Sequence, residues 1–153
     1  MSKVESRSGG CQCGAMRFKV TGELGGASIC HCRMCQKAFG GFFGPLVSAK
    51  KGSLTWTRGE LSHFQSSNAV KRGFCKNCGT PLTFEHMNGV ELAIGAFDDP
   101  LDIAPTSQLA IDKAVPYFPQ LHDLHIRQDN GVAQTPNGEP IISYQHPDHD
   151  TNN

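Results

Sequence analysis

The sequence predicts a mainly β fold in a single domain, with antiparallel sheets and few short helices. Short segments rich in β-branched and aromatic residues recur along the chain, and turns containing glycine, serine or asparagine separate them. This alternation of short strands and turns is typical of antiparallel sheets. The chain has 153 residues, which is the usual length of one domain.

Most of the expected elements are strands. In the first of them, Met16, Phe18 and Val20 alternate with Arg17 and Lys19, so one face of that strand should be buried. The expected strands are 15–20, 42–47, 53–57, 61–65, 69–74, 81–85 and 90–96, with an extended segment at 27–29 and an edge strand at 107–111. A short helix is expected at 33–39, ended by the glycine pair 40–41. Residues 117–124 fit a loop or a short helix.

All seven cysteines fall into three clusters, and an odd number of cysteines cannot be fully paired within one chain. The clusters are Cys11 and Cys13; Cys30, Cys32 and Cys35; and Cys75 and Cys78. Thiolates are soft ligands, and zinc prefers tetrahedral coordination by sulfur and nitrogen, which short C-x-C and C-x-x-C turns supply. The clusters therefore indicate metal binding, most simply by zinc.

The spacing suggests how seven thiols divide between two zinc ions per chain. The two outer pairs, Cys11 with Cys13 and Cys75 with Cys78, would form a closed structural site and tie two distant segments together. Cys30, Cys32 and Cys35 would then leave one coordination position open, as in catalytic zinc sites. Two alternatives stay open: a fourth ligand from elsewhere that closes this site, or a disulfide between Cys30 and Cys35 in oxidised protein.

These clusters suggest three regions: a flexible N-terminus at 1–8, a zinc-binding domain at 9–127, and an irregular C-terminal tail at 128–153. The tail is rich in Gly, Pro, Asn, Gln and Asp. It could be pinned to the domain by the apolar residues within 141–144. The histidine pairs His122 with His125 and His146 with His149 are expected at the surface.

Charge and hydropathy argue against two classes of partner. Lys plus Arg and Asp plus Glu both number 14, and no basic stripe is present, which disfavours a nucleic-acid role. Neither an apolar run long enough for a membrane helix nor a secretory leader is evident. We therefore expect a cytoplasmic protein without a membrane partner, in a compartment where thiols stay reduced.

Several linked motifs resemble one known family. They are GGCQCGAMRF, CHCRMCQKAFG, the serine pair 66–67, RGFCKNCGTPL and GAFDDP, in this order over residues 9–105. Together they resemble the glutathione-dependent formaldehyde-activating enzymes (GFA), whose domain is shared with centromere protein V. The resemblance implies several small antiparallel sheets, a structural zinc at the outer cysteine pairs and a catalytic zinc at Cys30, Cys32 and Cys35. It also implies a carbon–sulfur lyase or synthase that joins glutathione and formaldehyde.

The sequence does not single out a general base. Candidates near the motifs are His31, Ser66, Ser67, Arg72 and Asp98. His31 lies between two cysteines of an extended C-x-C segment, so its side chain should face away from their metal. Arg72 could bind a glutathione carboxylate in bidentate fashion.

Two other function classes compete with an enzyme. The first is a non-catalytic module that binds zinc or a thiol, or senses redox state. The second is chromatin association, as the name of centromere protein V suggests, but the chain lacks the basic extension this role would need.

Overall fold

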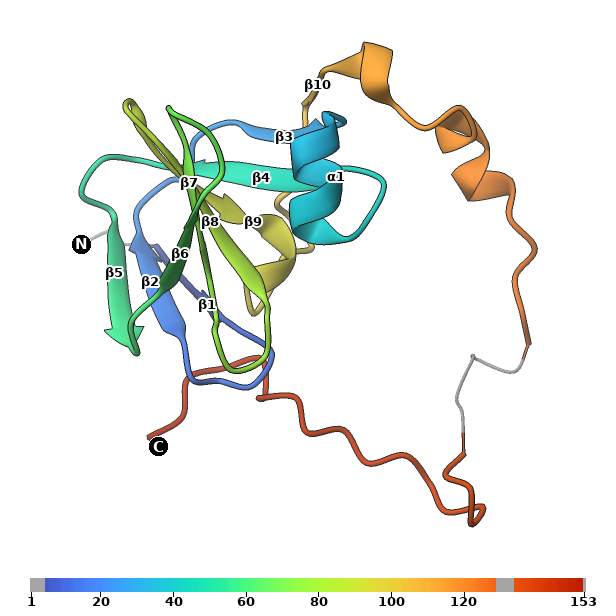
Figure 1. Ribbon diagram of the computed structural model, residues 1–153. Helices are drawn as coiled ribbons and strands as arrows, with labels where there is room; N and C mark the ends of the chain where they lie inside the picture. Colours follow the sequence, from blue (N-terminus) through green and yellow to red (C-terminus); the bar gives the residue numbers. More distant parts are fainter. Residues whose placement is uncertain (1–4, 129–133, 153) are drawn as a thin grey trace.

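Two β-sheets form the body of the protein, which we describe from a computed structural model for residues 5–128 and 134–152 (Figure 1). The three-stranded sheet has the order β1-β2-β5, and the seven-stranded sheet has the order β10-β3-β4-β9-β8-β7-β6. The strands are β1 (Ser6–Gly10), β2 (Arg17–Thr21), β3 (Ala27–Cys30), β4 (Gly44–Ala49), β5 (Leu54–Arg58), β6 (Ser62–Gln65), β7 (Lys71–Phe74), β8 (Pro81–His86), β9 (Gly89–Ala93) and β10 (Ser107–Leu109). The helices are α1 (Arg33–Phe39) and the 3-10 helices η1 (Ile94–Ala96), η2 (Ile111–Lys113) and η3 (Phe118–Asp123). The predicted mainly β fold is confirmed.

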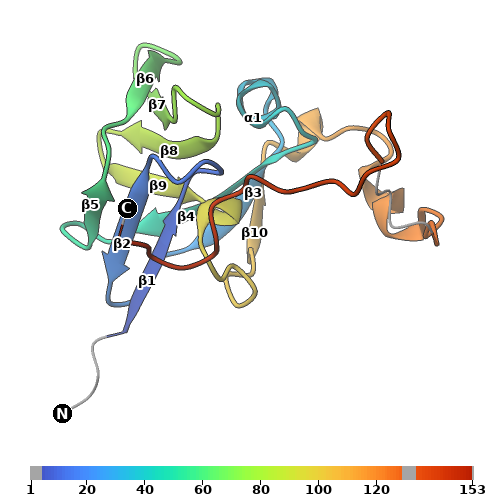
Figure 2. The same ribbon diagram turned by 90° about the horizontal axis from the view of Figure 1, so that it is seen from below.

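The core lies between the two sheets (Figure 2). Phe18 and Val20 of β2 are fully buried in one apolar cluster with Leu82 of β8 and Leu92 of β9. This arrangement follows from the alternation predicted for the first strand, because every second side chain of a strand points to the same face. Nowhere in the described residues does a helix have the length and apolar character needed to span a membrane.

Helix α1 begins and ends where the sequence predicts. Cys32 is its N-cap residue, and its sulfur accepts a hydrogen bond from the backbone N–H of Cys35 at 3.4 Å. Gly40 ends the helix in the left-handed conformation, with φ 61°, and its N–H bonds to the carbonyl of Gln36. Glycine adopts this conformation without the steric penalty of a Cβ atom. The local caps therefore fix the helix that carries Cys35 and is capped by Cys32.

The structure differs from the expected elements chiefly in three places, and elsewhere the strand ends shift by one or two residues. Residues 6–8, expected to be loose, belong to β1, which pairs with β2 over its whole length, and Arg7 forms an ion pair with Asp102 at 2.7 Å. The polar sequence of β1 does not by itself predict a strand. The segment is extended because it pairs with β2. The strand expected at 90–96 ends at Ala93 and continues as η1. Strand β10 pairs in parallel with β3, whereas the other strand pairs within the described residues are antiparallel.

The C-terminal tail returns to the three-stranded sheet, as its red end beside β1 and β2 shows (Figure 1). Asp150 accepts a hydrogen bond from Arg17 at 2.8 Å, and Arg58 donates to the backbone carbonyl and hydroxyl of Thr151. The N–H of His146 bonds to the carbonyl of Gln12 at 2.8 Å. His146 is therefore half-buried rather than at the surface, whereas His122, His125 and His149 are exposed as expected.

The ring of His146 also covers Gly14 closely. A Cβ atom on Gly14, which has φ +77°, would lie 2.2 Å from the ring. The residues expected to pin the tail do not do so, because Ile141, Ile142 and Tyr144 are exposed. The tail is instead fixed by polar contacts of His146, Asp150 and Thr151.

The contacts of the tail also offset the repulsion between two arginines. Arg17 of β2 and Arg58 of β5 are directly opposite each other, and like charges in such positions destabilise a sheet. Arg17 is only 3% exposed, and it donates to both Asp98 and Asp150. Burial works to raise the pKa of Asp98, but the hydrogen bonds from Arg17 and Ser8 outweigh it and hold the pKa below its ordinary value.

We expect Asp98→Asn to lower the free energy of unfolding by about 3 kcal/mol at pH 7, because a buried cation then loses its closest carboxylate. A lowered pKa in the folded state means that the carboxylate stabilises the fold at neutral pH. This contribution is lost as the pH falls through the lowered value. Urea unfolding at pH 7 measures the effect, with Asp102→Asn as the exposed control. Equal stability of Asp98→Asn and wild type would contradict the prediction.

Candidate metal centres

Four thiols from two distant turns meet at one point. The sulfur atoms of Cys11, Cys13, Cys75 and Cys78 all lie within 4.8 Å of one another. The sulfurs of Cys11 and Cys13 are 3.5 Å apart, and those of Cys13 and Cys75 are 3.8 Å apart. Zinc–sulfur bonds of about 2.3 Å place the corners of a tetrahedron about 3.8 Å apart. The four thiols therefore fit a closed tetrahedral metal site, as the spacing predicts.

Backbone hydrogen bonds shape both turns around the sulfurs. In the first turn, the N–H of Cys11 bonds to the carbonyl of Met16 at 3.0 Å, and the N–H of Met16 donates to the Cys11 sulfur at 3.2 Å. In the second, the N–H of Gly79 bonds to the carbonyl of Cys75 at 2.8 Å. The bonds to carbonyls fix the two turns, and the Met16 N–H, which points at the Cys11 sulfur, favours the thiolate form that binds metal.

Thr80 joins the two turns, a role that was not predicted from the sequence. Its hydroxyl lies 3.2 Å from the Cys78 sulfur and accepts a hydrogen bond from the N–H of Gln12 at 3.0 Å. Burial works to raise the pKa of Cys78, but the hydrogen bonds from Thr80 and Cys13 lower it to about 6. At neutral pH, Cys78 therefore favours the thiolate form, which is the form that binds metal.

The other three thiols form a second cluster at the start of α1. The sulfurs of Cys30, Cys32 and Cys35 lie within 4.8 Å of one another, and in the described part of the chain no fourth His, Cys, Asp or Glu joins them. All three cysteines are free, so no disulfide joins Cys30 to Cys35 in this structure. The cluster therefore fits a metal bound by three protein ligands.

Burial and hydrogen bonds shift the pKa values of these three thiols in different directions. Burial raises the pKa of Cys30, and it raises that of Cys35, which is 2% exposed, to about 12. Burial also opposes ionisation of Cys32, but hydrogen bonds outweigh it and lower the pKa, chiefly the one from the N–H of Cys35. A bound cation would favour the thiolate form of all three.

Arg72 of β7 contacts this cluster directly. Its Nη2 donates to the sulfur of Cys35 at 3.4 Å, and its Nε donates to the hydroxyl of Ser66 at 3.1 Å. The guanidinium also lies over the ring of Phe84, 4.8 Å from its centre. These contacts engage Nε and Nη2 of the guanidinium and direct it toward Cys35, so a bidentate carboxylate contact of Arg72 stays a prediction.

Three other candidate bases, His31, Ser67 and Asp98, make contacts away from the three thiols. His31 is fully buried, packs edge-on against Phe43 and Phe118, and has Nε2 2.9 Å from the Gln108 side-chain oxygen. It is not part of the thiol cluster. The hydroxyl of Ser67 accepts a hydrogen bond from the N–H of Ala69 in a turn, and Asp98 is held by Arg17.

A cavity of about 390 Å³ lies beside the three-thiol cluster, between α1 and the strands β6 and β7. Arg72 both lines this cavity and contacts Cys35. The lining residues are Arg33, Met34, Lys37, Ala38, Phe64, Ser66 and Arg72. Three of them are cationic, and Phe64 and Met34 are exposed apolar walls, so the cavity suits an anionic molecule with apolar parts.

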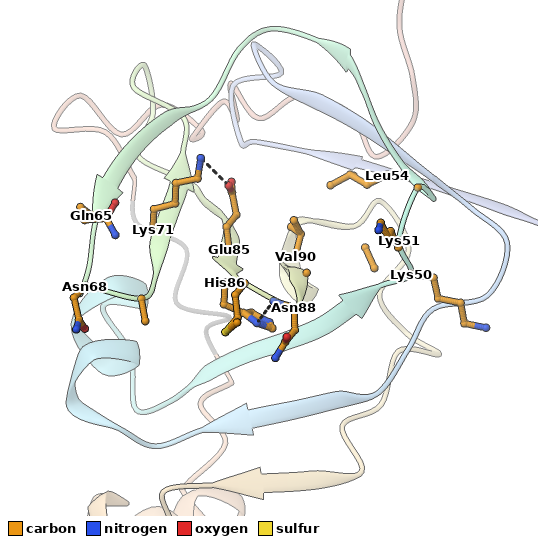
Figure 3. A pocket seen from close by; sticks show the side chains of 15 residues that line it. Lys50, Lys51, Leu54, Gln65, Asn68, Lys71, Glu85, His86, Asn88 and Val90 are labelled. Atoms are coloured by element: carbon orange, nitrogen blue, oxygen red, sulfur yellow. Dashed lines mark hydrogen bonds and ion pairs between the residues drawn. The ribbon is translucent and has the colours of Figure 1, made fainter.

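A larger cavity of about 650 Å³ lies elsewhere, among the turns of the strand pairs β4–β5, β6–β7 and β8–β9 (Figure 3). Its wall contains an ion pair of Lys71 with Glu85 at 3.3 Å, and no cysteine lines it. Size alone would favour this cavity as a binding site. The smaller cavity is the better candidate, because Arg72, which lines it, contacts Cys35.

Comparison with known proteins decides the family. The model of the family named glutathione-dependent formaldehyde-activating enzyme matches residues 6–113. The chain belongs to this GFA family. The match includes all seven clustered cysteines, and it begins at the first residue of β1.

Two further proteins are similar to this GFA chain. A Schizosaccharomyces pombe protein named "uncharacterized lyase" is 35% identical over 81 residues, which are 53% of this chain. The chain thus spans 58% of that relative's length. A crystal structure of a Rhodobacter sphaeroides protein superposes with a TM-score of 0.51 and 22% identity, covering 66% of this chain and 98% of that one. This second likeness concerns the fold alone.

Proposed function

We propose that this GFA protein is a zinc-dependent carbon–sulfur lyase or synthase that joins glutathione and formaldehyde into S-(hydroxymethyl)glutathione. The observation that carries the proposal is a three-thiol cluster without a fourth described ligand, beside a cavity lined by cations. The family name supports the two substrates, and the name of the yeast relative supports a lyase.

The seven cysteines would hold two zinc ions. Cys11, Cys13, Cys75 and Cys78 would bind a structural zinc, and Cys30, Cys32 and Cys35 a catalytic one. When bound at the three-thiol site, zinc supplies a Lewis acid that polarises an aldehyde oxygen or stabilises a thiolate. We also propose a cytoplasmic location, where the seven thiols stay reduced.

The reaction adds a thiol across a carbonyl group. A bond forms between the glutathione sulfur and the formaldehyde carbon, the thiol proton ends on the carbonyl oxygen, and nothing is oxidised or reduced. The chain's contribution is to hold the two reactants together and in the right orientation, which lowers the entropic part of the barrier. The cavity beside Cys35 would hold the glutathione, whose small aldehyde partner needs little room.

Helix α1 offers the contacts that would orient glutathione. Arg33 and Lys37 are four residues apart, so they lie on the same face of the helix, and both line the cavity. Glutathione carries two carboxylates at neutral pH, which these cations would attract. Met34 and Phe64 would contact the apolar part of the peptide.

The direct test measures zinc content and adduct formation together. We expect two zinc ions per chain, and adduct formation, followed by NMR exchange between free and bound formaldehyde, faster than the uncatalysed rate. A fully zinc-loaded protein that binds glutathione without accelerating the reaction would refute the enzyme and favour the thiol-binding module.

Reversing the two helix charges should weaken glutathione binding. For Arg33→Glu combined with Lys37→Glu we expect KM for glutathione to rise about tenfold or more with kcat little changed, because about 1.4 kcal/mol of uniform binding corresponds to a factor of ten. Lys50→Glu combined with Lys51→Glu, which makes the same total charge change in the larger cavity, is the matched control. An unchanged KM in the double variant would place the glutathione elsewhere.

A further inference from the structure

Arg72 is a buried cation in unusual surroundings. Arg72 is 8% exposed, and its guanidinium contacts a cysteine sulfur, a serine hydroxyl and a phenylalanine ring. The ion pairs found among the described residues do not include Arg72. A buried charge normally needs an opposite charge, because its effective desolvation penalty is several kcal/mol.

Of the three contacts, only the Cys35 sulfur can carry a full negative charge. The hydroxyl of Ser66 and the ring of Phe84 orient the guanidinium but leave its charge uncompensated. A divalent metal bound by three thiolates forms a group with a net charge of minus one. The positive charge of Arg72 would bring the buried assembly of metal, thiolates and arginine to neutrality.

We propose that Arg72 is a positioning residue that sets the metal affinity of the three-thiol site by compensating its charge at Cys35. This proposal rests on the metal site of the proposed function, but not on the reaction. It assigns Arg72 to the protein's own metal centre in place of a substrate carboxylate.

The contacts around Arg72 explain why the position needs arginine. Nε is held by Ser66 while Nη2 reaches Cys35, so two different nitrogen atoms of one rigid plane are used at once. The flat guanidinium also stacks over Phe84. A lysine ammonium is a single point charge on a flexible stem and cannot reproduce this arrangement.

The four-thiol site has no such cation among its observed sulfur contacts. Its described donors are neutral: the N–H of Met16 for Cys11 and the hydroxyl of Thr80 for Cys78. Cys13 is also exposed, so water can solvate that site's charge. A change at Arg72 should therefore affect one metal site and spare the other.

The experiment measures metal affinity rather than turnover. Zinc-loaded wild type, Arg72→Gln and Arg72→Lys are titrated with a chromogenic chelator, and released zinc is counted per chain. We expect Arg72→Gln to weaken the more labile site about 10- to 100-fold, the usual effect of losing a residue that supports a metal ligand. Arg72→Lys should give an intermediate loss, and the tighter site should be unchanged in both.

Arg33→Gln is the matched control, because Arg33 lines the same cavity but no contact to a cysteine sulfur is observed for it. Near-ultraviolet circular dichroism checks that each variant is folded. A folded Arg72→Gln with an affinity within twofold of wild type at the labile site would overturn the proposal. If Arg72→Gln does not fold, Arg72→Met decides, because methionine also removes the charge while keeping an unbranched side chain, and an affinity within twofold of wild type would overturn the proposal as well.

The outcome separates this inference from the proposed function. A weakened site in Arg72→Gln together with a wild type that shows no turnover would uphold the role of Arg72 and refute the enzyme. A wild type that binds only one zinc would refute the role of Arg72, while its turnover could still be measured.

Discussion

Cys78→Ser is expected to unfold most of the domain. Cys75 and Cys78 lie in the turn between β7 and β8, whereas Cys11 and Cys13 lie between β1 and β2. The four-thiol site thus joins the seven-stranded sheet to the three-stranded one. In zinc-finger peptides, structural zinc contributes about 10–16 kcal/mol, which is as large as the whole stability of a typical domain, about 5–15 kcal/mol. Little of the folded state should survive its loss.

Near-ultraviolet circular dichroism and thermal unfolding of Cys78→Ser test this prediction, with zinc content measured in parallel. Lys76→Ser is a useful control, because it places the same new residue in the same exposed turn without removing a ligand. A cooperative melt at the wild-type temperature in Cys78→Ser would show that the four-thiol site is not structural.

Cys32→Ser should have the opposite profile, with the fold kept and the activity lost. Cys30, Cys32 and Cys35 lie on one local segment, from the end of β3 to the first turn of α1. Closing such a short segment constrains little of the chain, so losing a ligand there should cost little stability. With two thiols left, we expect zinc to dissociate and adduct formation to fall to the uncatalysed rate.

Chelator titration of the wild type provides the companion measurement. We expect zinc to leave in two steps, the first abolishing activity with the near-ultraviolet signal intact and the second removing that signal. If Cys32→Ser unfolds the protein while Cys78→Ser stays folded and inactive, the roles of the two sites are reversed.

The features predicted well from the sequence are those decided by near neighbours. Helix α1 is bounded by Cys32 and Gly40, which act within one turn, and the alternation of β2 requires only that one face be apolar. The grouping of the thiols was also predictable, because two-residue and three-residue cysteine spacings restrict how ligands can meet.

The features that escaped prediction depend on distant partners. Strand β1 forms because it pairs with the edge of β2. Strand β10 pairs with β3, which lies 79 residues earlier in the sequence, with Ser107 opposite Ser28. The contact of Arg72 with Cys35 also escaped prediction, because nothing near Arg72 in the sequence reveals that Cys35 lies against it. Such pairings follow from the packing of the whole domain rather than from local preference.

The docked tail has a consequence for the order in which the protein is completed during synthesis. Arg17 precedes Asp98 by 81 residues and Asp150 by 133 residues. At about 5–20 residues per second, Asp150 is made roughly 7–27 seconds after Arg17. Until Asp98 has been made, Arg17 has neither of its two carboxylate partners, and until Asp150 has been made it has only one. The polar contacts around this early part of the chain can therefore be completed only after Asp150 and Thr151 have been made.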